Sequence, residues 1–317
     1  MGAADHLAIE AAHSEAELRA FNDAASRLRP YFAQTFEEFE HERGWAAADQ
    51  QVHLLARVNG RVAGVGWASR NSMHKEQARM SAFILADPDF DSVGVAAALF
   101  EGLSRFAAGL GFSGLSVERG LDDVPDATFW AERGYQEVER YIDVGLDLET
   151  FTVPPFELPR SVRIAPMNEH LNLIEQVYDV IGSSLVDIPT GEEIVMPPYE
   201  LWLQQELASP TSPPDLWHVA LTKSDVGDDL AVGIGMLERQ LARPEVVWHG
   251  FTCVRSNWRR TGIARALKYT TIRHAQQLGF RTLQTENEER NAPMRTLNIE
   301  LGYQPLPVRV LLHGPLA

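Results

Sequence analysis

Cysteine is nearly absent from the 317 residues: Cys253 stands alone, which excludes a disulfide within the chain. No stretch approaches the roughly 20 apolar residues of a membrane-spanning helix. The N-terminus also lacks the basic region and apolar core of a secretory signal. The 10 histidines show no paired spacing of the metal-ligand kind. These absences predict a cytoplasmic protein with no membrane partner and no metal.

Positive charge is also in short supply, because 28 lysines and arginines stand against 44 aspartates and glutamates, a formal net charge of -16. Nucleic-acid binding needs an extended basic surface, so we expect no nucleic-acid partner. Apolar residues make up 45% of the chain and charged residues 23%, as in an ordinary globular protein. The length suits two domains, each with its own core.

Three arginines nevertheless gather around one short turn. A β-rich stretch, 246–254, leads to Arg259, Arg260 and Gly262, and then to a helix with Arg265 in its first turn. Backbone N–H groups at a helix start are unpaired and lie at the positive end of the helix dipole. Gly262 lacks the side chain that would block an approaching oxygen. We therefore expect this turn to bind a pyrophosphate.

The turn reads Arg259-x-x-Gly262-x-Ala264 and resembles motif A of the GNAT N-acetyltransferase superfamily. Downstream come a second predicted strand, an Asn, and a short helix that ends in Gly302 plus an aromatic residue. This order is similar to the tail of the same family. The resemblance covers about 232–312.

A similar plan occurs earlier in the chain. Gly111 and Gly279 are separated by the same distance in sequence as Gly134 and Gly302, and each pair lies within a similar short motif. One offset shared by two motifs indicates an internal repeat.

The same offset relates the turn to an upstream counterpart, with Gly94 at the place of Gly262 but Asp91 at the place of Arg259. The upstream copy keeps the turn and loses the cations, and a carboxylate would repel a pyrophosphate. We therefore predict that the upstream copy has lost coenzyme binding and that the downstream copy is active. Two active sites are the alternative.

The predicted fold class is α/β, with two tandem GNAT-like domains that each contain a twisted mixed β-sheet flanked by helices. The predicted boundaries are 1–150 for the degenerate copy, 151–161 for a proline-containing linker, and 162–317 for the acetyl-CoA-binding copy.

Two local patterns specify structure in the first copy. Asn59-Gly60 accepts the positive φ angles of a tight turn and predicts a hairpin. Ser14, with Glu17 three residues later, predicts a capping box at the start of a helix.

The resemblance implies transfer of an acetyl group from acetyl-CoA to a primary amine of a small, cationic acceptor, by direct attack without an acyl-enzyme. In the family, the strand before the turn splays from its neighbour, and backbone N–H groups polarise the thioester in the gap. The residues that the resemblance implies for coenzyme binding are Cys253, Val254, Arg259, Arg260, Thr261, Gly262, Ile263, Ala264, Arg265, Asn287 and Asn291.

Deprotonation of an ammonium substrate needs a base with a near-neutral pKa, acting directly or through water. His249, in the middle of a predicted strand, is the first candidate, with Glu245 and Glu286 behind it; a packed structural histidine is the alternative. Many family members carry a tyrosine that protonates the departing sulfur, and the matching position here is Asn298. An amide is no acid, so the thiolate leaves with hydrogen-bond support alone, or Tyr303 or water substitutes, or catalysis is poor.

Acidic residues cluster around the helices that shape the acceptor pocket in this family. Asp187, Glu192, Glu193 and Glu200 belong to that cluster, and Glu286 is a further candidate contact to the substrate. They would attract a cationic amine by electrostatic focusing. A solvated acidic surface is the alternative, because the whole chain is acidic.

Three other residues have two interpretations each. Cys253 has no adjacent histidine in the sequence to activate it, so a buried inert thiol is favoured over a nucleophile. Trp202 and Trp217 are expected to fill the core, with a pocket wall as the alternative.

Two further functions stay open at this point. A mycothiol-synthase-like acetyltransferase is one, since that family is also a tandem GNAT of similar length. A non-catalytic acyl-CoA-binding sensor is the other, because Asn298 replaces the acid. A monomer and a homodimer are equally compatible with the sequence.

Overall fold

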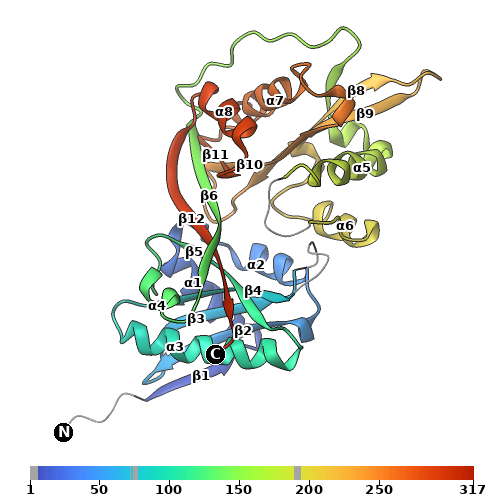
Figure 1. Cartoon of the computed structure of the whole chain (residues 1–317). Coiled ribbons are helices and arrows are strands. Elements are labelled where there is room, and N and C mark those ends of the chain that lie inside the picture. Colours follow the sequence, from blue (N-terminus) through green and yellow to red (C-terminus); the bar gives the residue numbers. More distant parts are fainter. Residues whose placement is uncertain (1–5, 72, 74–77, 189–193) are drawn as a thin grey trace. The chain divides into compact units, whose positions relative to one another are not determined.

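A computed structural model describes residues 6–71, 73, 78–188 and 194–317. The chain divides into two compact units, each with strands and flanking helices (Figure 1). Unit 1 is Met1–Tyr141 together with Pro307–Ala317, and unit 2 is Ile142–Leu306.

Unit 1 contains the strands in the order β1-β2-β3-β4-β5-β12, in which β4 and β5 are parallel. Its elements are β1 (Leu7–Ala11), α1 (Glu15–Leu28), α2 (Phe36–Arg43), β2 (Gln51–Val58), β3 (Arg61–Ser69), β4 (Arg79–Ala86), α3 (Ser92–Gly109), β5 (Gly114–Gly120), α4 (Ala127–Ala131), the start of β6 (Gln136–Asp147) and most of β12 (Gln304–Pro315).

Different helices bury the two faces of the unit 1 sheet. Leu54 of β2 packs in one cluster with Leu99 of α3. The adjacent Leu55 packs in another cluster with Phe21 of α1 and Phe39 of α2. Successive residues of a strand point to opposite faces. Helix α3 therefore covers one face, and α1 and α2 cover the other.

Both local predictions in this unit are confirmed. Ser14 Oγ accepts a hydrogen bond from the Glu17 amide at 3.3 Å, and Glu17 Oε2 accepts one from the Ser14 amide at 2.9 Å, which forms the capping box. Asn59 and Gly60 have φ angles of 50° and 82° at the turn between β2 and β3. Both angles are positive, as the hairpin turn requires.

Unit 2 contains the strands in the order β6-β11-β10-β9-β8-β7, in which β10 and β11 are parallel. Its elements, besides the end of β6, are β7 (Arg163–Pro166), α5 (Ile174–Leu185), α6 (Tyr199–Glu206), β8 (Trp217–Lys223), β9 (Asp229–Arg239), β10 (Val246–Val254), α7 (Ile263–Gln277), β11 (Thr282–Glu288) and α8 (Ala292–Glu300).

The internal repeat is visible in the element boundaries. The starts of β5 and β11 are as far apart in sequence as their ends, and β6 and β12 are separated by that same offset at both ends. Each copy follows the order strand, long helix, strand, short helix, strand from β4 or β10 onward. The predicted fold class, a mixed α/β protein made of two similar copies, is confirmed.

The units are not continuous segments, because the last eleven residues, Pro307–Ala317, belong to unit 1. The segment 151–161 has no helix or strand and is part of unit 2, where Phe156 stacks on Tyr269 with ring centroids 5.5 Å apart. The division into 1–150, 151–161 and 162–317 therefore stays a sequence-based prediction.

Packing of the C-terminal strand predicts an effect on unit 1. A Cβ on Gly314 would overlap the ring of Tyr135, whose hydroxyl donates to Pro315 O at 3.0 Å. We expect Gly314→Ala to lower the free energy of unfolding by about 1–3 kcal/mol, because the ring has no room to move away. Gly109→Ala is the control, since a Cβ there meets nothing within 4 Å. Urea denaturation measures both, and equal stabilities would contradict this packing.

Candidate active site

Strands β10 and β11 separate partway along their length. Their parallel pairing covers Val246 to Trp248 of β10 and ends there, although β10 continues to Val254. The last link is the Thr285 hydroxyl, which donates to the His249 carbonyl at 2.9 Å. We call this point, at His249 and Thr285, the fork. Beyond it the side of β10 that faced β11 is no longer paired with that strand.

A bulge in β10 coincides with the fork. The register between β10 and β9 is regular up to His249 opposite Leu237, then shifts, and resumes at Thr252 opposite Gly235. Gly250 and the residue after it lie in the shifted stretch. A bulge bends its strand and increases the local twist. The bulge therefore turns β10 where β11 is lost as a partner.

The helix that follows β10 begins with an open N-terminus. Gly262 is the N-cap of α7, with a φ of 89° and no side-chain hydrogen bond to the first-turn amides. A Cβ at Gly262 would meet nothing within 4 Å. Arg260, two residues earlier, also has a positive φ, of 58°. This turn with the first turn of α7, which we call the cradle, leaves backbone donors available to an anion.

Two of the three predicted cradle arginines are held by carboxylates. Arg259 donates through Nε to Val254 O at 3.0 Å and pairs with Asp187 at 2.7 Å. Arg265 pairs with Glu300, and both of these side chains are about half exposed. Arg260 is exposed. The three arginines thus lie around the cradle. Asp187, which was predicted to contact the acceptor, instead pairs with one of them.

The other predicted coenzyme residues lie around the same turn or beyond the fork. Thr261 closes the turn by donating to Trp258 O at 2.6 Å. Asn287 is buried near the end of β11. Asn291 caps α8, accepting from the Met294 amide at 3.4 Å. Ile263 and Ala264 form the first turn of α7, and Cys253 and Val254 end β10.

A buried polar cluster lies on the α7 side of the fork. The His249 side chain, 2% exposed, meets Tyr303 through Nδ1 at 3.2 Å and Thr271 through Nε2 at 2.8 Å. Lys268, one helical turn before Thr271, is 1% exposed, and its Nζ is 5.7 Å from the centroid of the Tyr303 ring. We call His249, Lys268, Thr271, Asn298 and Tyr303 the polar cluster.

Burial controls protonation in this cluster. It lowers the pKa of Lys268 to about 7. Burial, and then the nearby Lys268 charge, hold the pKa of His249 well below its usual value. Burial also raises the pKa of Tyr303. His249 and Tyr303 are therefore neutral near pH 7, whereas Lys268 is close to its midpoint.

The three predicted bases differ in position. Both ring nitrogens of His249 already have hydrogen-bond partners, which argues against the base role and for a packed structural histidine. Glu245 is exposed and precedes β10 at the end away from the fork. Glu286 is exposed and follows Thr285 directly. Of the two glutamates, Glu286 is the one beside the fork.

Cys253 is an inert thiol in this structure. It is buried, and its Sγ faces Val180 O of α5 at 3.8 Å. Burial raises the pKa of this thiol to about 12, so it stays protonated. Trp217 is fully buried, and its indole donates to Ser212 Oγ at 2.8 Å. Trp202 is also buried, so both tryptophans belong to the core.

The predicted acceptor residues are not gathered at one point. Glu200 lies in the first turn of α6, and Asp187 pairs with Arg259 at the cradle. Glu286 lies on β11 beside the fork. Glu192 and Glu193 lie outside the described residues.

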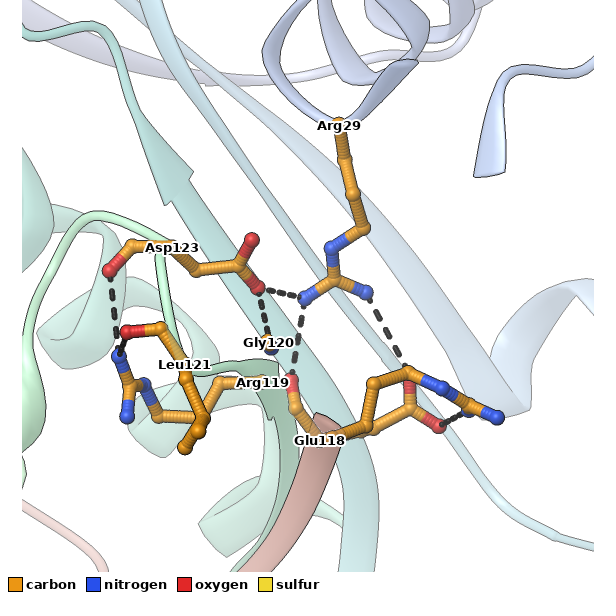
Figure 2. Close-up of polar contacts among 7 residues, drawn as sticks. Arg29, Glu118, Arg119, Gly120, Leu121 and Asp123 are labelled. Atoms are coloured by element: carbon orange, nitrogen blue, oxygen red, sulfur yellow. Dashed lines mark hydrogen bonds and ion pairs between the residues drawn. The ribbon is translucent and has the colours of Figure 1, made fainter. Parts of the chain in front are cut away.

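In unit 1, an arginine side chain lies at the place that corresponds to the fork of unit 2. Pairing of β4 with β5 ends at Ala82 and Val117, and Arg29 bridges the next residues of both strands. Its guanidinium lies 5.6 Å from the Phe83 ring centroid. It donates to Glu118 O at 3.4 Å and to Asp123 (Figure 2). The β3–β4 register is regular from Gly64 to Ser69, without the bulge of β10. In unit 1, therefore, Arg29 occupies the place that corresponds to the fork, and β4 has no bulge in its pairing with β3.

The helix start of unit 1 is also closed. Asp91 is the N-cap of α3, and its carboxylate accepts from the Gly94 amide at 3.1 Å. The anion that binds this helix start is therefore the chain's own side chain. Asp91 is the residue that the repeat places opposite Arg259.

Comparison with known proteins gives matches at the level of structure. No protein-family model and no curated protein sequence matches this chain. A GCN5-related N-acetyltransferase from Sphaerobacter thermophilus superimposes with a TM-score of 0.71 and 17% identity over 98% of this chain and 95% of that one. A tandem GNAT protein from the clavulanic acid biosynthesis pathway has a TM-score of 0.70 and 16% identity, over 98% of both chains. The chain has a tandem GNAT fold.

A third solved structure with this fold is the N-myristoyltransferase of Saccharomyces cerevisiae, determined with bound myristoyl-CoA. It has a TM-score of 0.65 and 10% identity, over 97% of this chain and 78% of that one. The tandem arrangement predicted from the repeat is confirmed by the likeness to the tandem GNAT protein. Among the residues described, no helix is long and apolar enough to cross a membrane.

Sequence reasoning missed three features of the site. The bulge carries no residue signature. Arg29 is separated from Asp123 by 94 residues, so its contact could not be read from spacing. Lys268 did leave a signal, because it shares the buried face of α7 with Ile272 and Ala275, four and seven residues on. A lysine at an apolar position of a helical pattern is the kind of exception that marks a site.

The buried Lys268 predicts an unusual dependence of stability on pH. Folding lowers its pKa from 10.5 to about 7, so between these values the unfolded chain binds a proton that the folded chain does not. The contribution of Lys268 to stability therefore rises with pH across this window and is least favourable below about pH 7. We expect Lys268→Met to raise the melting temperature by about 4 °C or more near pH 6. The gain should shrink toward about pH 10, and a gain independent of pH would contradict the burial of a charge.

Proposed function

We propose that unit 2 binds an acyl-CoA, acetyl-CoA in the first instance, and transfers its acyl group to a primary amine of a small acceptor. The carrying observation is the combination of a bulged β10 that leaves β11 at His249 and an uncapped helix start at Gly262. The two features suit the two ends of one ligand, a thioester and a pyrophosphate. The names of the structural neighbours, which include N-acetyltransferases, support this proposal.

The chain's own groups have distinct tasks in this proposal. The uncapped amides of the cradle bind phosphate oxygens, and Arg260 adds charge from the exposed side of the turn. Past the fork, β10 offers unpaired backbone groups to a ligand between the strands, where an N–H would polarise the thioester carbonyl. Bound acetyl-CoA supplies the acyl group and a thiol leaving group.

The amine attacks directly in this proposal. Cys253 is turned toward α5 and keeps its proton, which leaves the strand without a nucleophile for an acyl-enzyme. Glu286, at the exposed position after Thr285, is the proposed route for the proton of an ammonium substrate, directly or through water. Glu200 and Glu286 would also attract a cationic acceptor.

A second function is favoured by one observation. Asn298 occupies the position of the family tyrosine, and an amide supplies no proton. An acyl-CoA-binding sensor would need the cradle and the fork but no acid. Binding of acetyl-CoA without transfer to any of a panel of amines would favour the sensor.

Coenzyme binding is tested by a charge placed at the cradle. We expect Gly262→Asp to weaken acetyl-CoA binding by at least about tenfold, because a carboxylate would face the pyrophosphate and because φ is 89° there. Isothermal titration calorimetry measures the dissociation constant and the number of sites.

Gly279→Asp is the matched control for that variant. Gly279 follows the other end of α7, has a φ of 84°, and also leaves open space for a Cβ. The two variants thus share backbone strain and added charge but differ in distance from the cradle. Equal losses would show that strain, and not the anion site, causes the effect.

The contrast between the units predicts the stoichiometry. Arg29 fills the gap of unit 1 and Asp91 caps its helix, so we expect one acetyl-CoA per chain. In the same titration, two equivalent sites would make unit 1 a second coenzyme-binding copy. Arg29→Ala should leave the count at one, because the Asp91 cap remains.

A further inference from the structure

The polar cluster contains a buried lysine that lacks a compensating anion. Lys268 is 1% exposed, and in the described part of the chain no carboxylate forms an ion pair with it. The titratable groups that face it are His249 from β10 and Tyr303 from the junction of α8 and β12. Both are neutral near pH 7. Burying an unpaired ammonium costs much more than burying a leucine of similar size.

A second member of the cluster is also unsatisfied. Asn298 is 1% exposed, and among the described residues neither its Oδ1 nor its Nδ2 has a hydrogen-bond partner. Its main-chain carbonyl accepts from the Tyr303 amide at 3.1 Å, which ties the backbone of Asn298 to the residue whose ring Lys268 approaches. Buried amides almost always have partners, and those without one need an explanation. A buried lysine without a carboxylate partner and a buried amide without a hydrogen bond, both close to Tyr303 along the chain or in space, indicate a site for a polar ligand.

The position of Lys268 along α7 indicates which kind of ligand would occupy this site. Six residues separate it from Gly262, which corresponds to about 9 Å along the helix axis. One turn further, Thr271 binds the ring of His249, whose carbonyl is at the fork. Lys268 thus lies between the cradle and the fork. A ligand with its phosphates at the cradle and its thioester at the fork would run past this turn of α7.

We propose that Lys268 and Asn298 receive the sulfur of coenzyme A as it leaves, with Lys268 as the proton donor in place of the missing tyrosine. This inference rests on the proposed function. The amine nitrogen forms its bond to the acyl carbon, the carbon–sulfur bond breaks, and its electron pair stays on sulfur. Lys268 donates a proton to that sulfur and becomes neutral, while Asn298 Nδ2 donates a hydrogen bond. The proton lost by the amine, carried by water, restores the ammonium.

The electrostatics of the cluster suit this task. A proton donor works best when its pKa is near the working pH, and burial brings Lys268 to about 7. His249 and Tyr303 are poorer proton donors at neutral pH, because burial keeps His249 in its neutral form and raises the pKa of the Tyr303 phenol, which makes it a weaker acid. The positive charge also stabilises a thiolate in a site with few other charges. The rate of transfer should therefore fall as pH rises above about 7.

The first test is the acidity of bound coenzyme A. Ultraviolet absorbance of the thiolate, followed as a function of pH with coenzyme A bound to the full chain, gives the pKa of the bound thiol. We expect this pKa to lie below that of free coenzyme A in the wild type and to return to the free value in Lys268→Met. Lys223→Met is the control, because Lys223 is exposed and paired with Asp229. An unchanged thiol pKa in Lys268→Met would overturn the proposal.

The second test is kinetic. We expect Lys268→Met to reduce kcat by about 10²-fold or more and to abolish the fall in rate above pH 7, with little change in the dissociation constant of acetyl-CoA. In that background, Asn298→Tyr should restore part of the rate by returning the phenol. A melting curve confirms that each variant is folded. Unchanged kcat and an unchanged pH profile would refute the role of Lys268.

The outcomes separate this inference from the proposed function. Failure of the wild type to bind acetyl-CoA would remove both. Binding and transfer by the wild type, with Lys268→Met indistinguishable from it in thiol pKa and in rate, would leave the acetyltransferase standing and remove only the role of Lys268.

Discussion

The loss of pairing between β10 and β11 at His249 is the constraint on which the rest of unit 2 depends. Parallel strands normally satisfy each other's backbone groups along their shared length, and groups left without a partner are costly where water cannot reach them. Here the pairing stops after Trp248, and the Thr285 hydroxyl takes over the carbonyl of His249. The bulge in β10, seen in its pairing with β9 just after the same residue, bends the strand where its pairing with β11 ends. The open strand edge is therefore built into the fold.

In unit 1, side chains of the protein itself occupy the counterparts of the two places where a coenzyme would bind in unit 2. Unit 1 has the same order of elements at a constant offset, but its gap holds Arg29, which satisfies Glu118 O and contacts Phe83. Its helix start holds the carboxylate of Asp91. Both replacements supply from within the chain the kinds of group a coenzyme would supply from outside: a polar chain in the gap and an anion at the helix. Among the residues of unit 2 that the structure describes, neither substitute stands at the equivalent place, and Gly262 adds no side chain at the helix start.

Short sequence motifs were sufficient to predict several of these structural features. The Asn59-Gly60 turn, the Ser14 cap and the two copies of the repeat depend on short motifs and were predictable. The cradle was predictable because a glycine with a positive φ and an open helix start follow from a few adjacent residues. Contacts between distant segments were not, and Arg29 with Asp123 is an example. The arginines around the cradle could be listed from the sequence, but the pairing of Arg259 with Asp187 could not, because it depends on where α5 ends.

The polar cluster shows how the fold can carry such a site. A helix that packs against a sheet gains most of its stability from its apolar face, and α7 buries Ile263, Leu267 and Ile272 there. The stability gained from this packing outweighs the cost of burying one lysine in the same face. A shorter or more exposed helix would gain too little from packing to offset that cost. The cost is then localised within the described part of the cluster, since His249 and Thr271 satisfy each other, whereas Asn298 has no side-chain hydrogen bond and Lys268 has no carboxylate partner. Selection for stability alone would replace a lysine in this position by an apolar residue. The presence of a destabilising lysine therefore argues for a function that requires a charge or a proton.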